Sequence, residues 1–181
     1  VKEVVTSYDM ETVAGLGIKV DILAVRSLDL VANTAALAGE PMESIDLESP
    51  VIYDYLKTRD TYVGLFQIED GVTKEATRKI GPRHLTDLSA VLAISRPGAM
   101  KYIDQFAAYV KTGVIKPFYP AIDTILESTG GALIMQEQIT EVCREVFGLS
   151  GVDADSVRYA VGKKKREEMV KWEEPISTGG R

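Results

Sequence analysis

The sequence of 181 residues contains one cysteine, Cys143, and one histidine, His84. A single cysteine excludes an internal disulfide, and a lone histidine without a second cysteine excludes the common zinc sites, which need four nitrogen or sulfur ligands. We also expect no Ser-His-Asp triad around His84. Cys143 lies among apolar residues at helical spacing, which predicts a buried and unreactive thiol.

Long apolar runs are absent as well. No stretch approaches the roughly 20 apolar residues that a membrane-spanning helix needs. The first five residues, Val-Lys-Glu-Val-Val, lack the charged, apolar and small-residue order of a signal peptide. A composition with 45% hydrophobic and 27% charged residues is typical of a soluble globular protein with one domain or two small ones. We therefore expect a cytoplasmic protein with no membrane partner.

Positive charge is scarce in the first part of the chain. Residues 1–70 carry 5 Lys and Arg against 13 Asp and Glu, whereas residues 71–181 carry 16 against 14. The formal net charge of −6 argues against a protein that coats nucleic acid with a broad basic face. Residues 158–166 reverse the sign, with five positive charges in nine residues. Such a run is either a solvated helix start or a turn that faces an anion.

Two segments have the alternating, β-branched pattern of strands. Residues 17–23 place Lys19 and Asp21 on one face, with the apolar residues between them facing the core, and residues 62–68 form a second strand. A carboxylate inside a strand needs a cation. That cation is either Lys19 on an exposed edge strand or a divalent metal, because Mg²⁺ prefers carboxylate oxygens. The sequence pattern alone leaves both interpretations open.

Helices are predicted for most of the remaining chain from apolar spacing, caps and stops. Gly39 ends the first of them, Ser49 and Pro50 open the second, and Asp153 caps the fifth. The predicted ranges are 24–37, 50–58, 86–94, 136–147, 153–161 and a charged helix that begins near residue 166. The region after residue 71 is therefore expected to be mainly helical.

Three positions at the ends of these helices are candidates for binding an anion. Arg96 precedes a Pro-Gly break, which suits either a phosphate ligand or a plain surface turn. Gln136 opens a helix, where its amide can cap the helix or form a specific hydrogen bond. Gly162 ends a helix and leaves Lys163, Lys164 and Lys165 in a turn. That turn lacks the glycine spacing and the Ser or Thr of a P-loop, which excludes an ATPase of that type.

Taken together and in this order, these segments resemble the alpha subunit of bacterial DNA polymerase III, the C-family replicative DNA polymerase. The resemblance includes Gly-Leu-Phe-Gln-Ile-Glu at 64–69 and Gly-Ala-Leu-Ile-Met-Gln-Glu-Gln at 131–138. Several matching blocks at family-like spacing make it specific, and it covers nearly the whole chain. The matching segments are 6–10, 15–23, 64–69, 85–98, 131–138, 154–165 and 168–169.

The resemblance implies an α+β, mainly helical fold. Residues 1–70 would be the C-terminal part of a polymerase-beta-like nucleotidyltransferase palm, with a small β-sheet, and residues 71–181 an incomplete helical fingers region. Asp21 matches the third of three metal-binding palm aspartates, with Lys19 beside the site. The first two belong to a Pro-Asp-Ile-Asp-type motif that this sequence does not contain. The resemblance therefore implies that the chain alone is inactive.

The resemblance also implies a reaction and its partners. The reaction is Mg²⁺-dependent transfer of a nucleotide from a dNTP to the primer 3′-OH on primer–template DNA. Arg96, Arg158 and Lys163 match cations around the triphosphate, and Lys164 extends that set. Gln136, together with Gln138, matches fingers positions near the nascent base pair. The implied protein partners are the rest of the polymerase and, through regions outside this chain, the sliding clamp and other replisome subunits.

Some positions depart from the family pattern. Tyr159 stands where the family has a second arginine beside Arg158, and Met135 stands where it has a tyrosine. The loss of an arginine weakens the expected binding of the triphosphate. Two alternatives to a polymerase portion follow: a non-catalytic structural or interaction module of a replisome, and a free-standing helical domain that binds phosphate.

Overall fold

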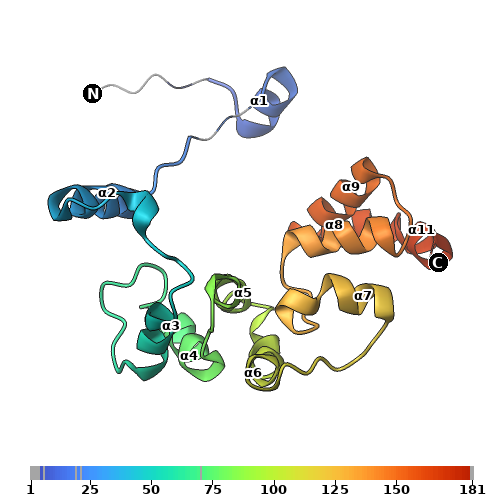
Figure 1. Ribbon diagram of the computed structural model, residues 1–181. Coiled ribbons are helices and arrows are strands. Elements are labelled where there is room, and N and C mark those ends of the chain that lie inside the picture. The colour runs from blue at the N-terminus through green and yellow to red at the C-terminus, as the bar shows by residue number, and fades with distance from the viewer. Residues whose placement is uncertain (1–4, 6, 19, 21, 70, 180–181) are drawn as a thin grey trace. The chain divides into compact units, whose positions relative to one another are not determined.

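The computed structural model describes residues 5, 7–18, 20, 22–69 and 71–179. They belong to two compact units, Val1–Ile45 and Asp46–Arg181 (Figure 1). Lys19 and Asp21 lie outside the described residues, so the roles expected of them stay predictions.

Every regular element among the described residues is a helix, so the prediction of an α+β fold with a palm β-sheet piece is wrong. In the segment 17–23, the described residues have no regular structure, and Ile18, Val20 and Ile22 are 93%, 75% and 95% exposed. A strand requires a neighbouring strand to pair its backbone N–H and C=O groups. No such neighbour is present in the described part of the chain, so the alternating pattern alone does not produce a strand.

The second predicted strand, residues 62–68, is a series of turns. The backbone N–H of Leu65 donates to the carbonyl of Tyr62 at 3.0 Å, and that of Ile68 donates to the carbonyl of Leu65 at 3.1 Å. Gly64 and Gln67 have positive φ angles of 83° and 65°, which no strand contains. Tyr62 and Ile68, at the two ends of these turns, pack into the core and are only 1% and 8% exposed.

The described residues of the first unit form the helices α1 (Met10–Leu16) and α2 (Arg26–Ala38) and the short 3₁₀ turn η1 (Met42–Ser44). Asp9 caps α1 by accepting a hydrogen bond from the backbone N–H of Thr12 at 2.8 Å. Gly39 ends α2 in the left-handed conformation, with φ 73°, which confirms the predicted stop.

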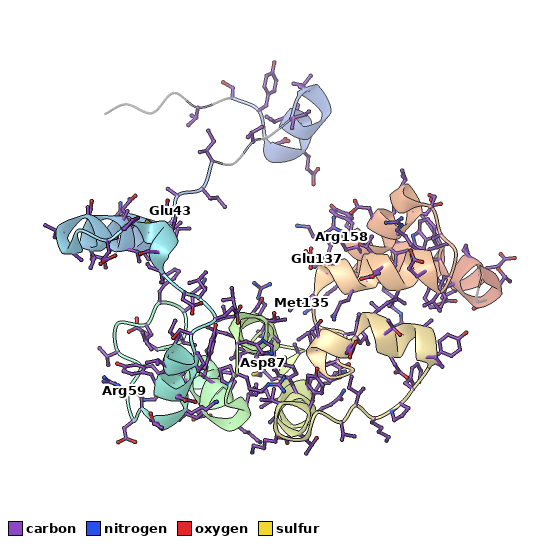
Figure 2. The ribbon with its side chains drawn as sticks, viewed as in Figure 1. Glu43, Arg59, Asp87, Met135, Glu137 and Arg158 are labelled. Carbon is purple, nitrogen blue, oxygen red and sulfur yellow. The ribbon has the colours of Figure 1, made fainter. Side chains whose placement is uncertain are left out.

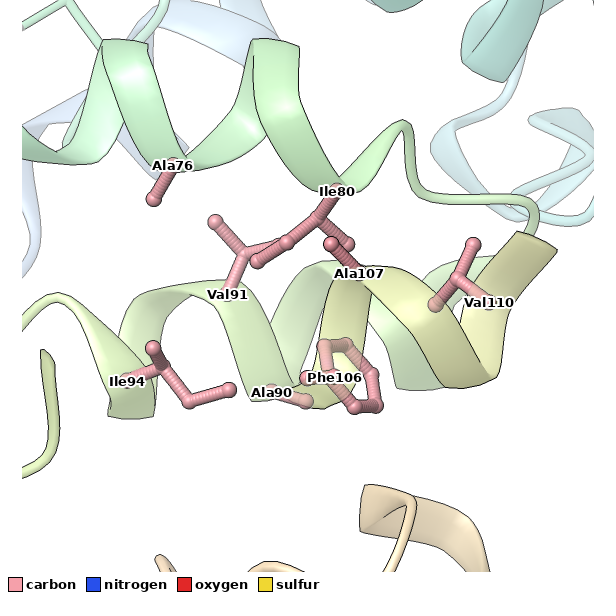
Figure 3. Close-up of a cluster of buried hydrophobic side chains, with 8 residues drawn as sticks. All are labelled: Ala76, Ile80, Ala90, Val91, Ile94, Phe106, Ala107 and Val110. Atoms are coloured by element: carbon pink, nitrogen blue, oxygen red, sulfur yellow. The ribbon is translucent and has the colours of Figure 1, made fainter. Parts of the chain in front are cut away.

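The described part of the second unit begins with α3 (Pro50–Thr58), α4 (Gly71–Ile80), α5 (Leu85–Ile94) and α6 (Ile103–Thr112), with η2 (Met100–Tyr102) before α6. The predicted helix over 50–58 is confirmed with the same bounds. Figure 3 shows the central cluster between α4, α5 and α6. Burial of each large apolar side chain there contributes about 1.5–3 kcal/mol. The cluster comprises Ala76, Ile80, Ala90, Val91, Ile94, Phe106, Ala107 and Val110.

The N-terminus of α5 carries a buried carboxylate with a structural partner. Asp87 is 0% exposed, and its carboxylate accepts hydrogen bonds from Arg83 Nε at 2.8 Å and from the backbone N–H of Arg83 at 2.9 Å. The hydrogen bond to Asp87 raises the pKa of the Arg83 guanidinium, which therefore stays charged. His84 caps the helix by accepting from the backbone N–H of Asp87 at 3.4 Å. The single histidine therefore has a structural role.

The remaining elements of the second unit are α7 (Pro120–Ile125), η3 (Glu127–Thr129), α8 (Gln136–Glu145), α9 (Gly151–Gly162), α10 (Arg166–Val170) and α11 (Glu173–Gly179). Helices α8 and α9 lie side by side and share a core of Cys143, Ala154 and Val157 (Figure 1). Cys143 is 3% exposed, which confirms the predicted buried thiol.

The cap of α9 differs from the prediction. Ser150, and not Asp153, is the N-cap, and its hydroxyl accepts a hydrogen bond from the backbone N–H of Asp153 at 3.2 Å. None of the helices in the described part of the chain is long and apolar enough to cross a membrane.

Candidate functional site

The arginine at the start of the basic run is held by two polar side chains. Arg158 Nη1 donates to Gln136 Oε1 at 2.8 Å, and Arg158 Nε donates to Asp155 Oδ1 at 2.8 Å. A guanidinium has five N–H donors, and these two contacts use two of them. The side chain is 30% exposed, so the other donors are accessible to a ligand on the open side.

Helix packing determines where this arginine lies. Asp155 and Arg158 are one turn apart on α9, and Gln136 is the first residue of α8. The two helices are fixed to each other by the buried cluster around Cys143 and Val157. The positive end of the α8 dipole adds to the positive potential near Gln136. A cation that two neighbours hold in place is preorganised for an anion, because less side-chain freedom is lost on binding.

The guanidinium lies at the edge of an open hollow of about 500 Å³ between α8 and α9. Figure 2 shows Arg158 beside Glu137 on the neighbouring helix. The lining has four carboxylates and two guanidiniums, those of Arg144 and Arg158, so an anion would meet repulsion near the carboxylates and attraction at the arginines. The hydrogen bond between Asp155 and Arg158 lowers the pKa of the carboxyl and raises that of the guanidinium, so both stay charged near neutral pH. The lining residues are Gln136, Glu137, Thr140, Glu141, Arg144, Glu145, Asp155 and Arg158.

The three lysines after Gly162 form the predicted turn, but a different residue takes the left-handed conformation. Gly162 is the last helical residue, and Lys164 has φ 55°. The backbone N–H of Lys164 donates to the carbonyl of Val161 at 3.1 Å, and that of Lys165 to the carbonyl of Ala160 at 2.9 Å. These bonds close the end of α9, and all three lysines are exposed there.

The lysine side chains differ in their partners. Lys165 Nζ forms an ion pair with Glu168 Oε1 at 2.8 Å and lies 5.2 Å from the centre of the Tyr159 ring. Lys163 and Lys164 are exposed and have no side-chain partner among the described residues. Lys163 follows Arg158 by five residues, which corresponds to about 7.5 Å along a helix axis. Two unpaired lysines therefore lie just beyond the C-terminus of the helix that carries Arg158.

The other candidate residues are not joined to this group. Arg96 follows α5 and is exposed, and the turn there is closed by a bond from the backbone N–H of Ala99 to the carbonyl of Arg96 at 3.0 Å. No hydrogen bond or ion pair among the described residues links Arg96 to Arg158 or to Gln136. The structure thus brings together Arg158 and Gln136 and places Lys163 and Lys164 in the turn that follows the helix of Arg158.

The described residues include no group of three or more His, Cys, Asp or Glu side chains that could hold a metal ion. Asp21, the expected Mg²⁺ ligand, lies outside these residues, so its role stays a prediction.

The sequence patterns missed two features of this region. The ion pair of Asp155 with Arg158 was not expected, although their spacing of three residues on a helix is a sufficient signal. Gln138 is 6% exposed, and its amide oxygen accepts from the backbone N–H groups of Ile134 and Met135 at 3.1 Å each. The third position of a helix is a common site for such a cap, and the predicted helix start at Gln136 identifies it.

The sequence is similar to those of known proteins. The family model of the bacterial DNA polymerase III alpha subunit finger domain matches residues 26–181. The chain is 34% identical, over 97% of its length, to the DNA polymerase III subunit alpha of Mycobacterium leprae. Its identity to the DNA polymerase III subunit alpha of Halalkalibacterium halodurans is 33% over 96% of the chain, and its identity to that of Thermus aquaticus is 32% over 98%. The chain spans about a sixth, 16%, of the length of each of these relatives. The predicted palm–fingers boundary after residue 70 stays a prediction.

Proposed function

The chain belongs to the family of bacterial DNA polymerase III alpha subunits, and from this premise we propose that it supplies the fingers surface that binds the triphosphate of an incoming dNTP. One observation carries the proposal: the guanidinium of Arg158 is fixed by Gln136 and Asp155 while its remaining donors stay accessible. Lys163 and Lys164 add two unpaired positive charges at the end of the same helix.

The chemistry of this group suits a triphosphate. A guanidinium presents paired N–H groups that match two phosphate oxygens, and an ammonium acts as a mobile point charge. In phosphoryl and nucleotidyl transfer, the protein contributes mainly positioning and charge stabilisation. A fixed arginine followed by free lysines provides both contributions. Arg96 would be a further triphosphate ligand, since its side chain has no partner among the described residues.

The proposed reaction joins the α-phosphate of the dNTP to the primer 3′-oxygen on primer–template DNA, with pyrophosphate as the leaving group. Mg²⁺, held in part by Asp21 with Lys19 beside it, would neutralise charge on the reacting oxygens. Two such ions need more than one carboxylate. The proposal therefore requires the other palm aspartates, and it includes the rest of the polymerase, and through it the clamp, as partners.

Primer extension by the complete polymerase, meaning this chain together with the palm region that bears the remaining aspartates, tests this function. We expect Mg²⁺-dependent extension that Asp21→Asn abolishes without unfolding the chain. Asp29→Asn, which changes an exposed carboxylate of α2, is the control and should retain extension. Extension by the Asp21→Asn variant would remove Asp21 from the metal site. No extension from two folded parts would favour the non-catalytic replisome module.

A further inference from the structure

A buried polar network joins the turn before α8 to the first turn of that helix. Thr129 is 0% exposed and Gln138 is 6% exposed. Gln138 Nε2 donates to Thr129 Oγ1 at 2.7 Å, and Thr129 Oγ1 donates to the carbonyl of Ala132 at 2.7 Å. The amide oxygen of Gln138 accepts from the backbone N–H groups of Ile134 and Met135. The side chain of Gln138 therefore spans the turn from one end to the other.

The network is satisfied within the protein. No buried side-chain nitrogen or oxygen in the described part of the chain lacks a hydrogen-bond partner. A buried polar network whose members are all paired makes the surrounding structure rigid, whereas loss of one member leaves the others with an unpaired polar atom in a site of low dielectric. Removal of the Thr129 hydroxyl would leave both Gln138 Nε2 and the carbonyl of Ala132 without this partner.

The same turn is fixed on its other side by α6. The side-chain amide of Gln105 donates to the carbonyl of Gly130 at 2.9 Å. Tyr109 packs so closely that a Cβ atom added at Gly130 would lie 2.7 Å from Tyr109 Cβ. The turn is thus held between the core of α4, α5 and α6 and the side chain of Gln138.

Gln138 and Gln136 share the first turn of α8, and Gln136 is the residue that holds Arg158 (Figure 2 labels Met135, Glu137 and Arg158 in this region). We propose that the Thr129–Gln138 pair positions the start of α8, and through it the Gln136 amide, so that the Arg158 guanidinium faces the triphosphate. This inference rests on the proposed function of Arg158. Neither member of the pair touches the ligand, so both are positioning residues.

The test compares a variant that removes the hydroxyl with one that retains it. Thr129→Val replaces the hydroxyl by a methyl group of similar size, and Thr129→Ser retains it. In the complete polymerase, we expect Thr129→Val to raise the KM for dNTP about five- to tenfold, because loss of a buried hydrogen bond has this order of effect. Thr129→Ser should stay within about twofold of the parent. An equal rise of KM in both variants would overturn the proposal.

A matched control separates positioning from a general loss of stability. Thr77 is also 0% exposed, and its hydroxyl donates to the carbonyl of Thr73 at 2.8 Å within α4. Thr77→Val removes a buried hydroxyl in the same way but away from α8. It should lower the melting temperature and leave the KM for dNTP unchanged. A rise of KM equal to that of Thr129→Val would mean that the effect is one of stability, and the proposal would fail.

A double-mutant cycle with Arg158→Ala shows whether the pair acts through the arginine. We expect Thr129→Val to add no more than about twofold to the KM of the Arg158→Ala protein. If the two effects multiply, the positioning inference is wrong while the proposed function stands. If Arg158→Ala alone leaves KM unchanged, the proposed function itself fails. Should Thr129→Val not fold, Gln138→Met, which retains length without hydrogen bonds, enters the same cycle with the same expectations.

Discussion

Arg158 Nη1 and Gln136 Oε1 lie 2.8 Å apart although the two residues are separated by 22 positions in the sequence. This hydrogen bond connects the middle of α9 with the first residue of α8. The orientation of the Arg158 guanidinium therefore depends on the packing of α8 against α9.

Asp155 competes with a phosphate for Arg158. Asp155→Asn keeps the size of the side chain and removes its charge, so we expect the KM for dNTP to fall about two- to fivefold, as the loss of an exposed ion pair suggests. Steady-state kinetics of the complete polymerase measures this. Asp104→Asn, which removes a carboxylate from the exposed ion pair with Lys79, is the matched control and should have no effect. A higher KM for Asp155→Asn would show that the orientation of Arg158 by Asp155 outweighs the competition of this carboxylate with the phosphate.

The lysines after α9 differ in whether their charge is already paired. Lys163→Ala should raise the KM for dNTP about two- to fivefold and reduce its dependence on salt, because an unpaired exposed cation attracts the triphosphate through a screened field. Lys165→Ala should have a smaller effect, since Lys165 is paired with Glu168. Lys111→Ala, on the last turn of α6, is the control outside α9. Equal effects at Lys163 and Lys111 would speak against a specific phosphate contact.

Gly130 is required by both its backbone angle and its close contact with Tyr109. Gly130→Ala places a Cβ at φ 61° and within 2.7–2.9 Å of three Tyr109 atoms. We expect the free energy of unfolding to fall by about 2–5 kcal/mol, the sum of left-handed strain and overpacking. Gly113 has φ 69° and no described atom within 4 Å of an added Cβ. Gly113→Ala should therefore lose about 1–2 kcal/mol from strain alone. Urea unfolding compares the two, and equal losses would contradict the Tyr109 contact.

Cys143 should react with a thiol reagent only after unfolding, because it is 3% exposed and burial raises the pKa of its thiol. The raised pKa also predicts the direction of a pH effect. Below about pH 8.5 the thiol is protonated in both states, and above it the unfolded thiol ionises first. The free energy of unfolding should then fall as the pH rises, and this part of the fall should be absent in Cys143→Ala. Urea unfolding of both proteins at pH 7 and at pH 9.5 provides the measurement. Fast labelling of the native protein would contradict the burial.

The sequence predicted helix ends well where the signal is local. Gly39 stops α2 and Ser49-Pro50 opens α3, because a glycine with positive φ and a proline in the first turn act within a few residues. The strand predictions failed because alternation does not identify what a side chain packs against. Tyr62 and Ile68 are buried although they belong to turns, and the carbonyl of Leu56 accepts a hydrogen bond from the Tyr62 hydroxyl.

The sequence named the candidate residues, whose roles stay predictions, but it did not give their contacts. The family resemblance identified Arg158, Gln136 and Lys163, but the bond between Arg158 and Gln136 is made by helix packing over a long sequence separation. The ion pair with Asp155 is local and follows from helical spacing. Gln138 is expected near the nascent base pair, which stays a prediction; its amide hydrogen-bonds to the turn before α8 and to Thr129, contacts that the resemblance did not give.

The most direct test of the central claim is the KM for dNTP of the complete polymerase with Arg158 replaced. Arg158→Ala should raise the KM about tenfold or more, because a charge-assisted contact to phosphate is lost. Arg158→Lys should recover part of the affinity, since an ammonium retains the charge but not the paired donors. Both variants should remain folded, because the side chain is partly exposed and contacts Asp155 and Gln136 at the surface. A KM within about twofold of the parent for folded Arg158→Ala would contradict the assignment of this arginine to the triphosphate.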